Sequence, residues 1–115
     1  MSVYLFVYGS LRDPAVQRAL FGRVVDGTAD ALPGYRLNTV TIRDEGAIRT
    51  SGTATHLILD PSDDPGDRVP GMVLRLSETE LRAADAYEVD DYARIAVTLE
   101  SGIEAFVYAR AGEAH

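Results

Sequence analysis

Short apolar runs separated by turn-forming residues dominate this sequence and restrict the folds open to it. Each run is rich in β-branched or aromatic residues and is bounded by glycine, proline or polar residues, a pattern typical of strands. The predicted strands are residues 3–8, 24–31, 35–42, 53–59, 72–76, 92–99 and 105–109. Only two segments have helical character, so turns must join most of the strands. The sequence therefore favours an α+β fold with a mostly antiparallel, curved sheet rather than a doubly wound one.

The first helix is predicted directly after the first strand. Asp13 suits the cap and Pro14 the first helical position, and the helix is expected to end near Gly22. Its apolar residues are Val16, Ala19 and Leu20. Two polar stretches, residues 43–52 and 60–71, are predicted to be loops because glycine, proline and aspartate interrupt any periodic pattern there.

The second helix is predicted at residues 78–87. Ser77 can cap it, and Glu80 stands three residues later, as a capping box requires. Between two of the strands, Pro33 and Gly34 fit the central positions of a type II turn.

One acidic residue falls on the inward face of this second helix. Leu81, Ala84 and Glu88 follow one another at spacings that place them on a single face. Burial disfavours the charged form of a carboxyl group, so Glu88 is a candidate proton carrier near neutral pH. The alternatives are an ion pair of Glu88 with Arg94 or Arg12, or a solvent-exposed side chain at the helix end.

The exit of the first strand, "YGSL", offers a second candidate. Successive N–H groups at Gly9, Ser10 and Leu11 can form a concave site for a carboxylate, although a simple turn also explains the pattern. Ser10 would need a base to act as a nucleophile. His56 is the one histidine before the chain end, so covalent serine catalysis is disfavoured.

Three further polar side chains have structural explanations from the pattern alone. Tyr92 and Tyr108 alternate with apolar residues on their strands, which favours core packing. Asp85 lies on a neighbouring helix face and is expected to accept hydrogen bonds from backbone N–H groups of an adjoining loop.

Composition excludes several function classes. Without cysteine there are no disulfides, thiolate nucleophiles or sulfur-ligated metals. All eleven basic residues are arginine, which excludes a Schiff-base or phosphate-binding lysine. These arginines are dispersed and the net charge is −7, so a nucleic-acid partner is not expected. We see no membrane span and no signal peptide, and we expect one cytoplasmic domain over residues 1–115.

Several motifs occur in a familiar order: "YGSLR", "LPGYRL", "VPGMVLRL", "ADAYEVDDYARIAV" and "EAFVYAR". With these motifs the chain resembles the γ-glutamylcyclotransferase-like, or AIG2-like, family over residues 3–110. The resemblance implies a small mixed, mostly antiparallel β-barrel with flanking helices and a cavity at one mouth. It also implies that no metal or organic cofactor is needed.

The resemblance assigns roles to particular residues. Glu88 matches the acid/base of the family, and Tyr92 and Tyr108 match residues that border the cavity. The loop expected to bind the α-carboxylate of the substrate consists of Tyr8, Gly9, Ser10 and Leu11. The implied reaction releases 5-oxoproline from a small γ-glutamyl substrate, with no nucleic-acid or membrane partner. A non-catalytic small-ligand-binding module and a hydrolase that uses Ser10 with His56 are the alternatives. The leaving group and the oligomeric state stay open.

Overall fold

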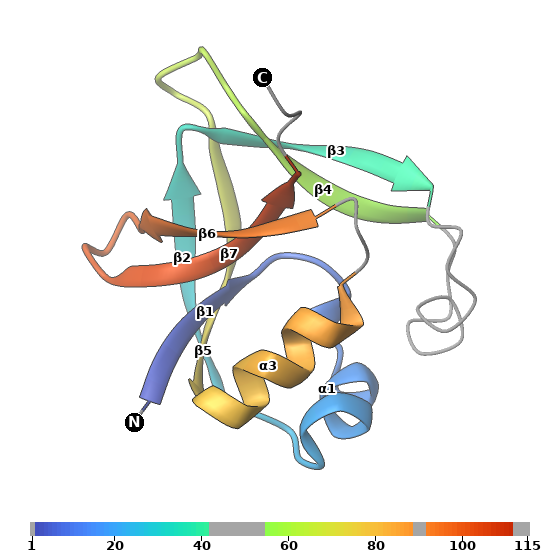
Figure 1. Ribbon diagram of the computed structural model, residues 1–115. Coiled ribbons are helices and arrows are strands. Elements are labelled where there is room, and N and C mark those ends of the chain that lie inside the picture. Colours follow the sequence, from blue (N-terminus) through green and yellow to red (C-terminus); the bar gives the residue numbers. More distant parts are fainter. Residues whose placement is uncertain (1, 42–54, 89–91, 112–115) are drawn as a thin grey trace.

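The molecule is built around one five-stranded sheet, with two helices and a separate two-stranded ribbon packed against it (Figure 1). A computed structural model describes residues 2–41, 55–88 and 92–111. Its strands are β1 (Ser2–Val7), β2 (Gly27–Pro33), β3 (Tyr35–Thr41), β4 (Thr55–Pro61), β5 (Arg68–Ser77), β6 (Tyr92–Thr98) and β7 (Glu104–Arg110). Its helices are the 3-10 helix η1 (Ser10–Arg12) and the α-helices α1 (Pro14–Phe21) and α3 (Glu78–Tyr87). The predicted α+β class is confirmed.

The five-stranded sheet is open, so the predicted barrel is wrong. The strand order is β2-β5-β1-β7-β6, which makes β2 and β6 the edge strands, and β3 and β4 form their own sheet. The pairs β1–β5, β2–β5 and β6–β7 are antiparallel, as predicted for most of the sheet. The parallel pair β1–β7 is in register at Leu5 and Phe106, a short junction between two antiparallel halves. A closed barrel needs continuous pairing around the sheet, and the described strands do not provide it.

Two predicted strand boundaries require correction. The apolar run at residues 24–31 suggested a strand there, but β2 begins at Gly27. Val25 lies instead in the connection from α1, where its N–H donates to the buried Gln17 side chain. The proline-rich segment at residues 60–71 was expected to be a loop throughout, but β5 starts at Arg68.

The position of Pro70 in the sheet shows how a strand can begin inside the proline-rich segment. It pairs with Ala31 on β2, whereas β1 reaches only as far as the pair Val7–Met72. Pro70 therefore lies beyond the end of β1, on a stretch of β5 with one neighbouring strand, where a missing N–H is tolerated. The predicted loop at residues 43–52 lies outside the described residues.

Both α-helices begin as the sequence predicted. The Asp13 carboxylate accepts a hydrogen bond from the Ala15 N–H, Pro14 opens α1, and Gly22 ends it with a positive φ of 72°. Ser77 and Glu80 form the complete capping box of α3. The described part of the chain contains no helix with the length and apolar composition that a membrane crossing requires.

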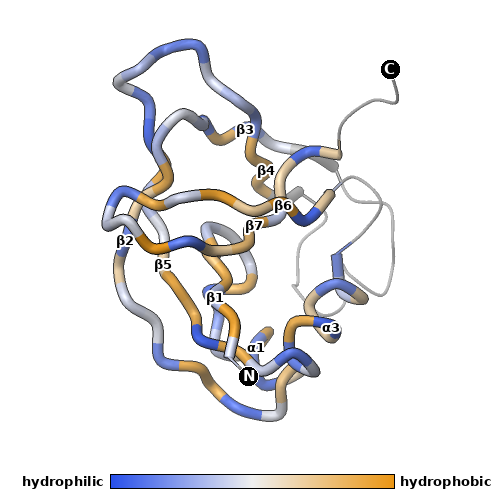
Figure 2. Tube along the Cα trace, turned by 60° about the vertical axis from the view of Figure 1, so that its left-hand side comes forward, coloured by the Kyte–Doolittle hydropathy of each residue, from blue (hydrophilic) through white to orange (hydrophobic). Residues whose placement is uncertain are grey.

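The sheet buries residues on both of its faces, which accounts for the unbroken apolar run in β1. Leu5 and Val7 pack with Val16 of α1 and Leu81 of α3. On the other face, a second cluster includes Phe6, Tyr8, Leu32, Leu59 and Val107. Figure 2 shows the hydrophobic residues gathered along β1 and β5, the strands between these two layers. The loop after β1 therefore starts from a rigid, two-sided core.

Candidate functional site

The "YGSL" loop leaves the centre of the sheet and turns at once into η1. Tyr8 is buried, and its hydroxyl donates to the backbone oxygen of Tyr108 on β7 at 2.5 Å. Gly9 is the cap of η1, whose first N–H groups have no partner within the helix. Leu11 points into the core, and its carbonyl accepts from the Gln17 side chain at 2.8 Å. Anchors on both sides thus hold the backbone of the loop in place.

The end of α3 meets this loop through one side-chain contact. The Tyr87 hydroxyl and the Ser10 Oγ atom lie 2.9 Å apart and share a hydrogen bond. Glu88 follows Tyr87 directly and caps the helix, with its N–H bonded to the Ala84 oxygen at 3.1 Å. Leu81 and Ala84 are buried, as the spacing predicted. The helix therefore ends with Glu88 next to the residue that contacts the loop.

The Glu88 carboxyl has unusual acid–base behaviour for a glutamate. Burial raises its pKa to about 8, and the nearby negative charge of Asp85 adds to the effect. The ion pairs among the described residues do not include Glu88, and Arg94, one of the two arginines considered in the alternative of an ion pair, pairs with Asp85. At pH 7 most Glu88 side chains are therefore protonated, with an ionised fraction of about a tenth.

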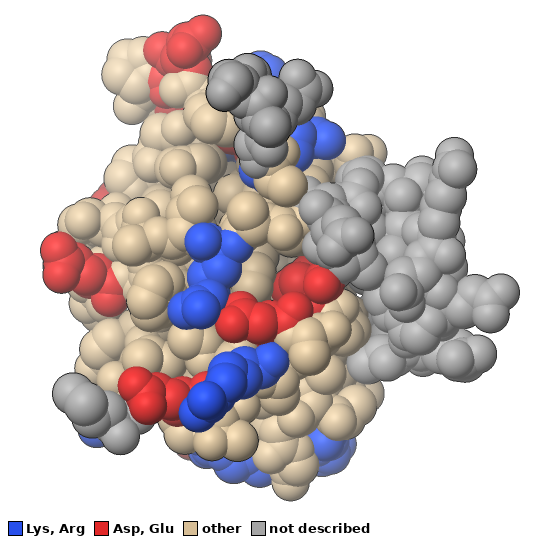
Figure 3. Space-filling model, viewed as in Figure 1, with Lys and Arg blue, Asp and Glu red and all other residues tan. Residues whose placement is uncertain are grey.

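Asp85 has side-chain partners that the sequence did not predict, and its expected hydrogen bonds from loop N–H groups stay a prediction. Its Oδ1 atom accepts the Tyr108 hydroxyl at 2.6 Å and lies 3.0 Å from the Arg94 Nε atom. These donors are side chains of β7 and β6, not backbone N–H groups of a loop. Figure 3 shows oppositely charged groups side by side over α3 and next to β6.

Tyr92, the first residue of β6, is the next predicted site residue. Its hydroxyl donates to the backbone oxygen of Leu57 on β4 at 2.7 Å. A Cβ atom added at Gly9 would lie 3.9 Å from the Leu57 Cβ atom, so this loop and Tyr92 meet the same residue. Burial raises the pKa of the Tyr8 hydroxyl far above its ordinary value, with further contributions from Tyr92 and Glu88. The predicted residues of the loop, α3 and β6 are thus within electrostatic reach of one another.

Tyr108 takes part in the same group. Burial raises the pKa of its hydroxyl far above the ordinary value, and the bond to Asp85 and the charge of Glu88 add to this. The described residues hold no group of three histidine, cysteine or acidic side chains arranged for a metal ion. The arrangement combines a proton-exchanging carboxyl, neutral hydroxyls and a loop whose first helical N–H groups have no partner within η1. Such a set can bind a small carboxylate and move a proton beside it.

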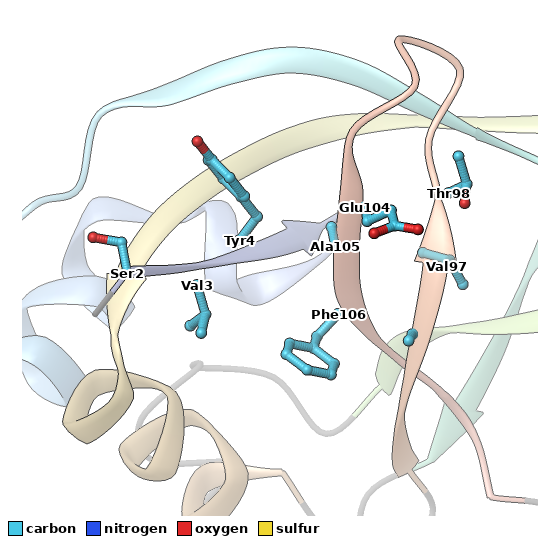
Figure 4. A pocket seen from close by; sticks show the side chains of 9 residues that line it. Ser2, Val3, Tyr4, Val97, Thr98, Glu104, Ala105 and Phe106 are labelled. Carbon is cyan, nitrogen blue, oxygen red and sulfur yellow. The ribbon is translucent and has the colours of Figure 1, made fainter.

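A pocket between β1 and the β6–β7 pair is separate from this group. Figure 4 shows it, with Val3 and Phe106 on one side of the sheet and Tyr4 on the other. None of the predicted site residues lines it.

Sequence reasoning missed two partners in the site. The Tyr87 contact with Ser10 was not foreseen, although Tyr87 stands directly before Glu88 in the motif. The Asp85–Arg94 pair was also missed, because its members lie nine positions apart on different elements. The side chain of His56, the base considered for Ser10, is outside the described part of the structure.

Comparisons with known proteins agree with this architecture. Residues 5–115 match the family model described as gamma-glutamyl cyclotransferase, AIG2-like. A comparison with curated proteins finds no significant match. An Arabidopsis thaliana protein solved in solution is 25% identical with a TM-score of 0.74, covering 99% of this chain and 72% of its own. A second Arabidopsis thaliana protein is 27% identical with a TM-score of 0.67, covering 96% and 62%.

A structure described as a gamma-glutamyl cyclotransferase shares the fold. It has a TM-score of 0.76 at 18% identity, covering 97% of this chain and 68% of that one. The chain thus spans between 62% and 72% of the length of these three proteins.

Proposed function

The chain belongs to the gamma-glutamyl cyclotransferase, AIG2-like family, and on that premise we propose that it is an enzyme that releases 5-oxoproline from a γ-glutamyl amine or amino acid. Glu88 is the acid/base in this proposal. Tyr8, Gly9, Ser10 and Leu11 form the loop that binds the α-carboxylate, and Tyr92 and Tyr108 border the substrate. The substrate is a small molecule, and the reaction uses no metal or organic cofactor.

The observation that carries the proposal is the pKa of Glu88, about 8, at a helix end tied to the "YGSL" loop. Burial and Asp85 raise this pKa, and the Tyr87–Ser10 contact brings the loop to the same helix end. A general acid/base works best when its pKa lies near the operating pH. An ordinary surface glutamate would be ionised at pH 7 and could not donate a proton.

For this reaction the protein needs to do little more than hold the substrate in its reactive conformation. In a γ-glutamyl amide the α-amine is tethered to the carbonyl that it attacks, so ring closure is intramolecular and avoids the entropic cost of bringing two molecules together. Holding the α-carboxylate at Gly9 and Ser10 would select the conformer in which the amine faces the carbonyl carbon. The new C–N bond closes the lactam, and the original C–N bond to the leaving amine breaks.

The protons balance through Glu88. The α-ammonium must lose two protons to become the lactam N–H, and the leaving nitrogen gains two when it departs as an ammonium ion. Ionised Glu88 takes the first proton, which frees the amine for attack. The resulting carboxylic acid donates to the departing nitrogen, and the second proton follows the same path or exchanges with water. In the enzyme without substrate, the ionised fraction of Glu88 increases as pH rises toward 8. We therefore expect kcat/KM to rise as pH approaches 8.

The test is a substrate panel with 5-oxoproline release as the readout. γ-Glutamyl amino acids, γ-glutamyl-ε-lysine and glutathione are incubated separately with the protein and with Glu88→Gln. We expect release from at least one substrate and a loss of at least about 100-fold in Glu88→Gln. Glu78→Gln, an exposed change at the other end of α3, serves as the matched control and should retain activity.

Two outcomes would replace the proposal. Ligand-induced thermal stabilisation without turnover on any substrate would favour the non-catalytic binding module. Activity that survives Glu88→Gln but is lost in Ser10→Ala and His56→Ala would favour the hydrolase.

A further inference from the structure

A polar cluster one helical turn before Glu88 contains two residues, Asp85 and Arg94, that have no direct part in the proposed reaction. The Asp85 Oδ1 atom receives two donors, the Tyr108 hydroxyl at 2.6 Å and the Arg94 Nε atom at 3.0 Å. Hydrogen bonds with an ionised partner are the stronger kind. Because the donors come from β7 and β6, Asp85 connects the last turn of α3 to both strands.

The sheet register explains why these donors converge. Arg94 and Tyr108 are directly opposite each other on the antiparallel pair β6–β7. Their side chains therefore share a face of the sheet and can meet the same carboxylate. Arg94 also makes a cation–π contact, since its guanidinium carbon lies 4.7 Å from the centre of the Phe106 ring. The Arg94 and Asp85 side chains are 32% and 35% exposed, so water reaches the pair only in part.

Asp85 in turn acts on Glu88. Asp85 stands three positions before Glu88, the C-cap of α3, and its negative charge adds to burial in raising the Glu88 pKa. Among residues 2–41, 55–88 and 92–111, the other groups that respond to the charge of this carboxyl are the hydroxyls of Tyr8, directly after β1, and Tyr108 on β7. Arg94 is the cation of the cluster, and it reaches Asp85. The charge next to Glu88 therefore depends on whether Arg94 is in place.

We propose that Arg94 is a positioning residue for Glu88: it clamps Asp85 against Tyr108 and compensates the negative charge beside the Glu88 carboxyl. The consequence for catalysis rests on the proposed function, in which Glu88 carries the proton. The effect on the Glu88 carboxyl itself does not, because it follows from contacts that exist without substrate. Arg94 would thereby set the pH at which the site becomes active.

The ionisation midpoint of Glu88 tests this directly. It is followed by NMR of isotope-labelled glutamate carboxyl carbons, with the Glu88 resonance assigned by its loss in Glu88→Gln. Arg94→Met removes the cation but keeps an apolar stem over Phe106, and it should raise the midpoint by about one pH unit. Asp85→Asn should lower the midpoint by about one pH unit. Arg94→Lys keeps the charge and should bring the midpoint back to within about 0.3 units of the unmodified protein.

Arg68→Met is the matched control. Arg68 forms a surface ion pair with Glu100 at 2.8 Å, at the end of β5 that pairs with β2. Its replacement also removes one arginine from an ion pair, and it should leave the Glu88 midpoint unchanged. Should Arg94→Met not fold, Asp85→Asn and Arg94→Lys still test the coupling from both sides.

The outcomes separate this inference from the proposed function. An unmoved midpoint in Arg94→Met and Asp85→Asn, or equal shifts in Arg94→Met and Arg68→Met, would overturn the positioning role. Reduced stability with no change in midpoint would show a purely structural role and overturn it too. If the midpoints move as expected but no substrate yields 5-oxoproline, the positioning role stands and the proposed reaction fails. Where turnover is found, the pH profile of kcat/KM should move in the same direction as the midpoint.

Discussion

Replacing Glu88 by glutamine should make the protein more resistant to unfolding at alkaline pH. In the folded chain the Glu88 pKa is raised to about 8 from its ordinary 4.5. Below pH 4.5 both the folded and the unfolded states hold the proton, so the group favours neither. Between pH 4.5 and about pH 8, the unfolded chain releases the proton while the folded chain keeps it. Folding stability is therefore lost progressively up to about pH 8, and the loss is constant above it.

The magnitude follows from the two pKa values. Each unit of difference corresponds to about 1.36 kcal/mol, so the whole shift corresponds to about 5 kcal/mol. Most of this falls between pH 5 and pH 8, where Glu88 lowers the free energy of unfolding by about 3 kcal/mol. Glutamine keeps the shape and has no proton to lose, so Glu88→Gln should not show this decline.

Urea denaturation at a series of pH values measures the effect. The quantity of interest is the free energy of unfolding of Glu88→Gln minus that of the unmodified protein, because all other titrating groups cancel in this difference. It should grow by about 3 kcal/mol from pH 5 to pH 8. Glu78→Gln, an exposed change at the other end of α3, is the matched control and should not show growth of this size. A flat difference for Glu88→Gln as well would refute the burial of an uncharged carboxyl at this helix end.

Three stability changes follow from other contacts. Gly71→Ala would place a Cβ atom 2.5 Å from the Val7 oxygen, so β1 and β5 must separate, and urea titration should show a loss of about 2 kcal/mol or more. Ser77→Ala removes the capping box of α3, which should cost about 1 kcal/mol and reduce amide-exchange protection in the first turn. Tyr87→Phe removes the hydrogen bond to Ser10 and should cost about 1 kcal/mol in the same titration, whereas a neutral result would show that the contact is not formed in solution.

Local signals predicted the elements on which Glu88 depends. The caps at Asp13 and Ser77 and the stripe of Leu81 and Ala84 act within a few residues, so the pattern alone could locate both helices. Glu88 follows the same stripe, which is why its inward placement could also be foreseen. Boundaries set by distant neighbours could not be. Pro70 can be part of β5 because β1 ends before reaching it, and no residue near Pro70 indicates where β1 ends.

The open edges of the sheet and the polar partners in the site could not be predicted, for a related reason. Whether β2 and β6 meet depends on twist and register over the whole sheet, and strand patterns carry little information about this. The pairing of Asp85 with Arg94 depends on β6 being opposite β7 in one register. The alternative that paired Glu88 with Arg94 or Arg12 included the correct arginine but not its carboxylate, because spacing alone does not distinguish two acidic residues three positions apart at the end of α3.

The protonation states in the site limit which group can move a proton. Tyr8 and Tyr108 have pKa values far above their ordinary range because both rings are buried, so their hydroxyls stay neutral at physiological pH. Both hydroxyls are also committed as donors, Tyr8 to a backbone oxygen and Tyr108 to Asp85. Glu88 differs from them, because it changes charge near pH 8. Of these three groups, Glu88 alone can both accept and release a proton under mild conditions, while the tyrosines hold the surrounding strands at fixed positions.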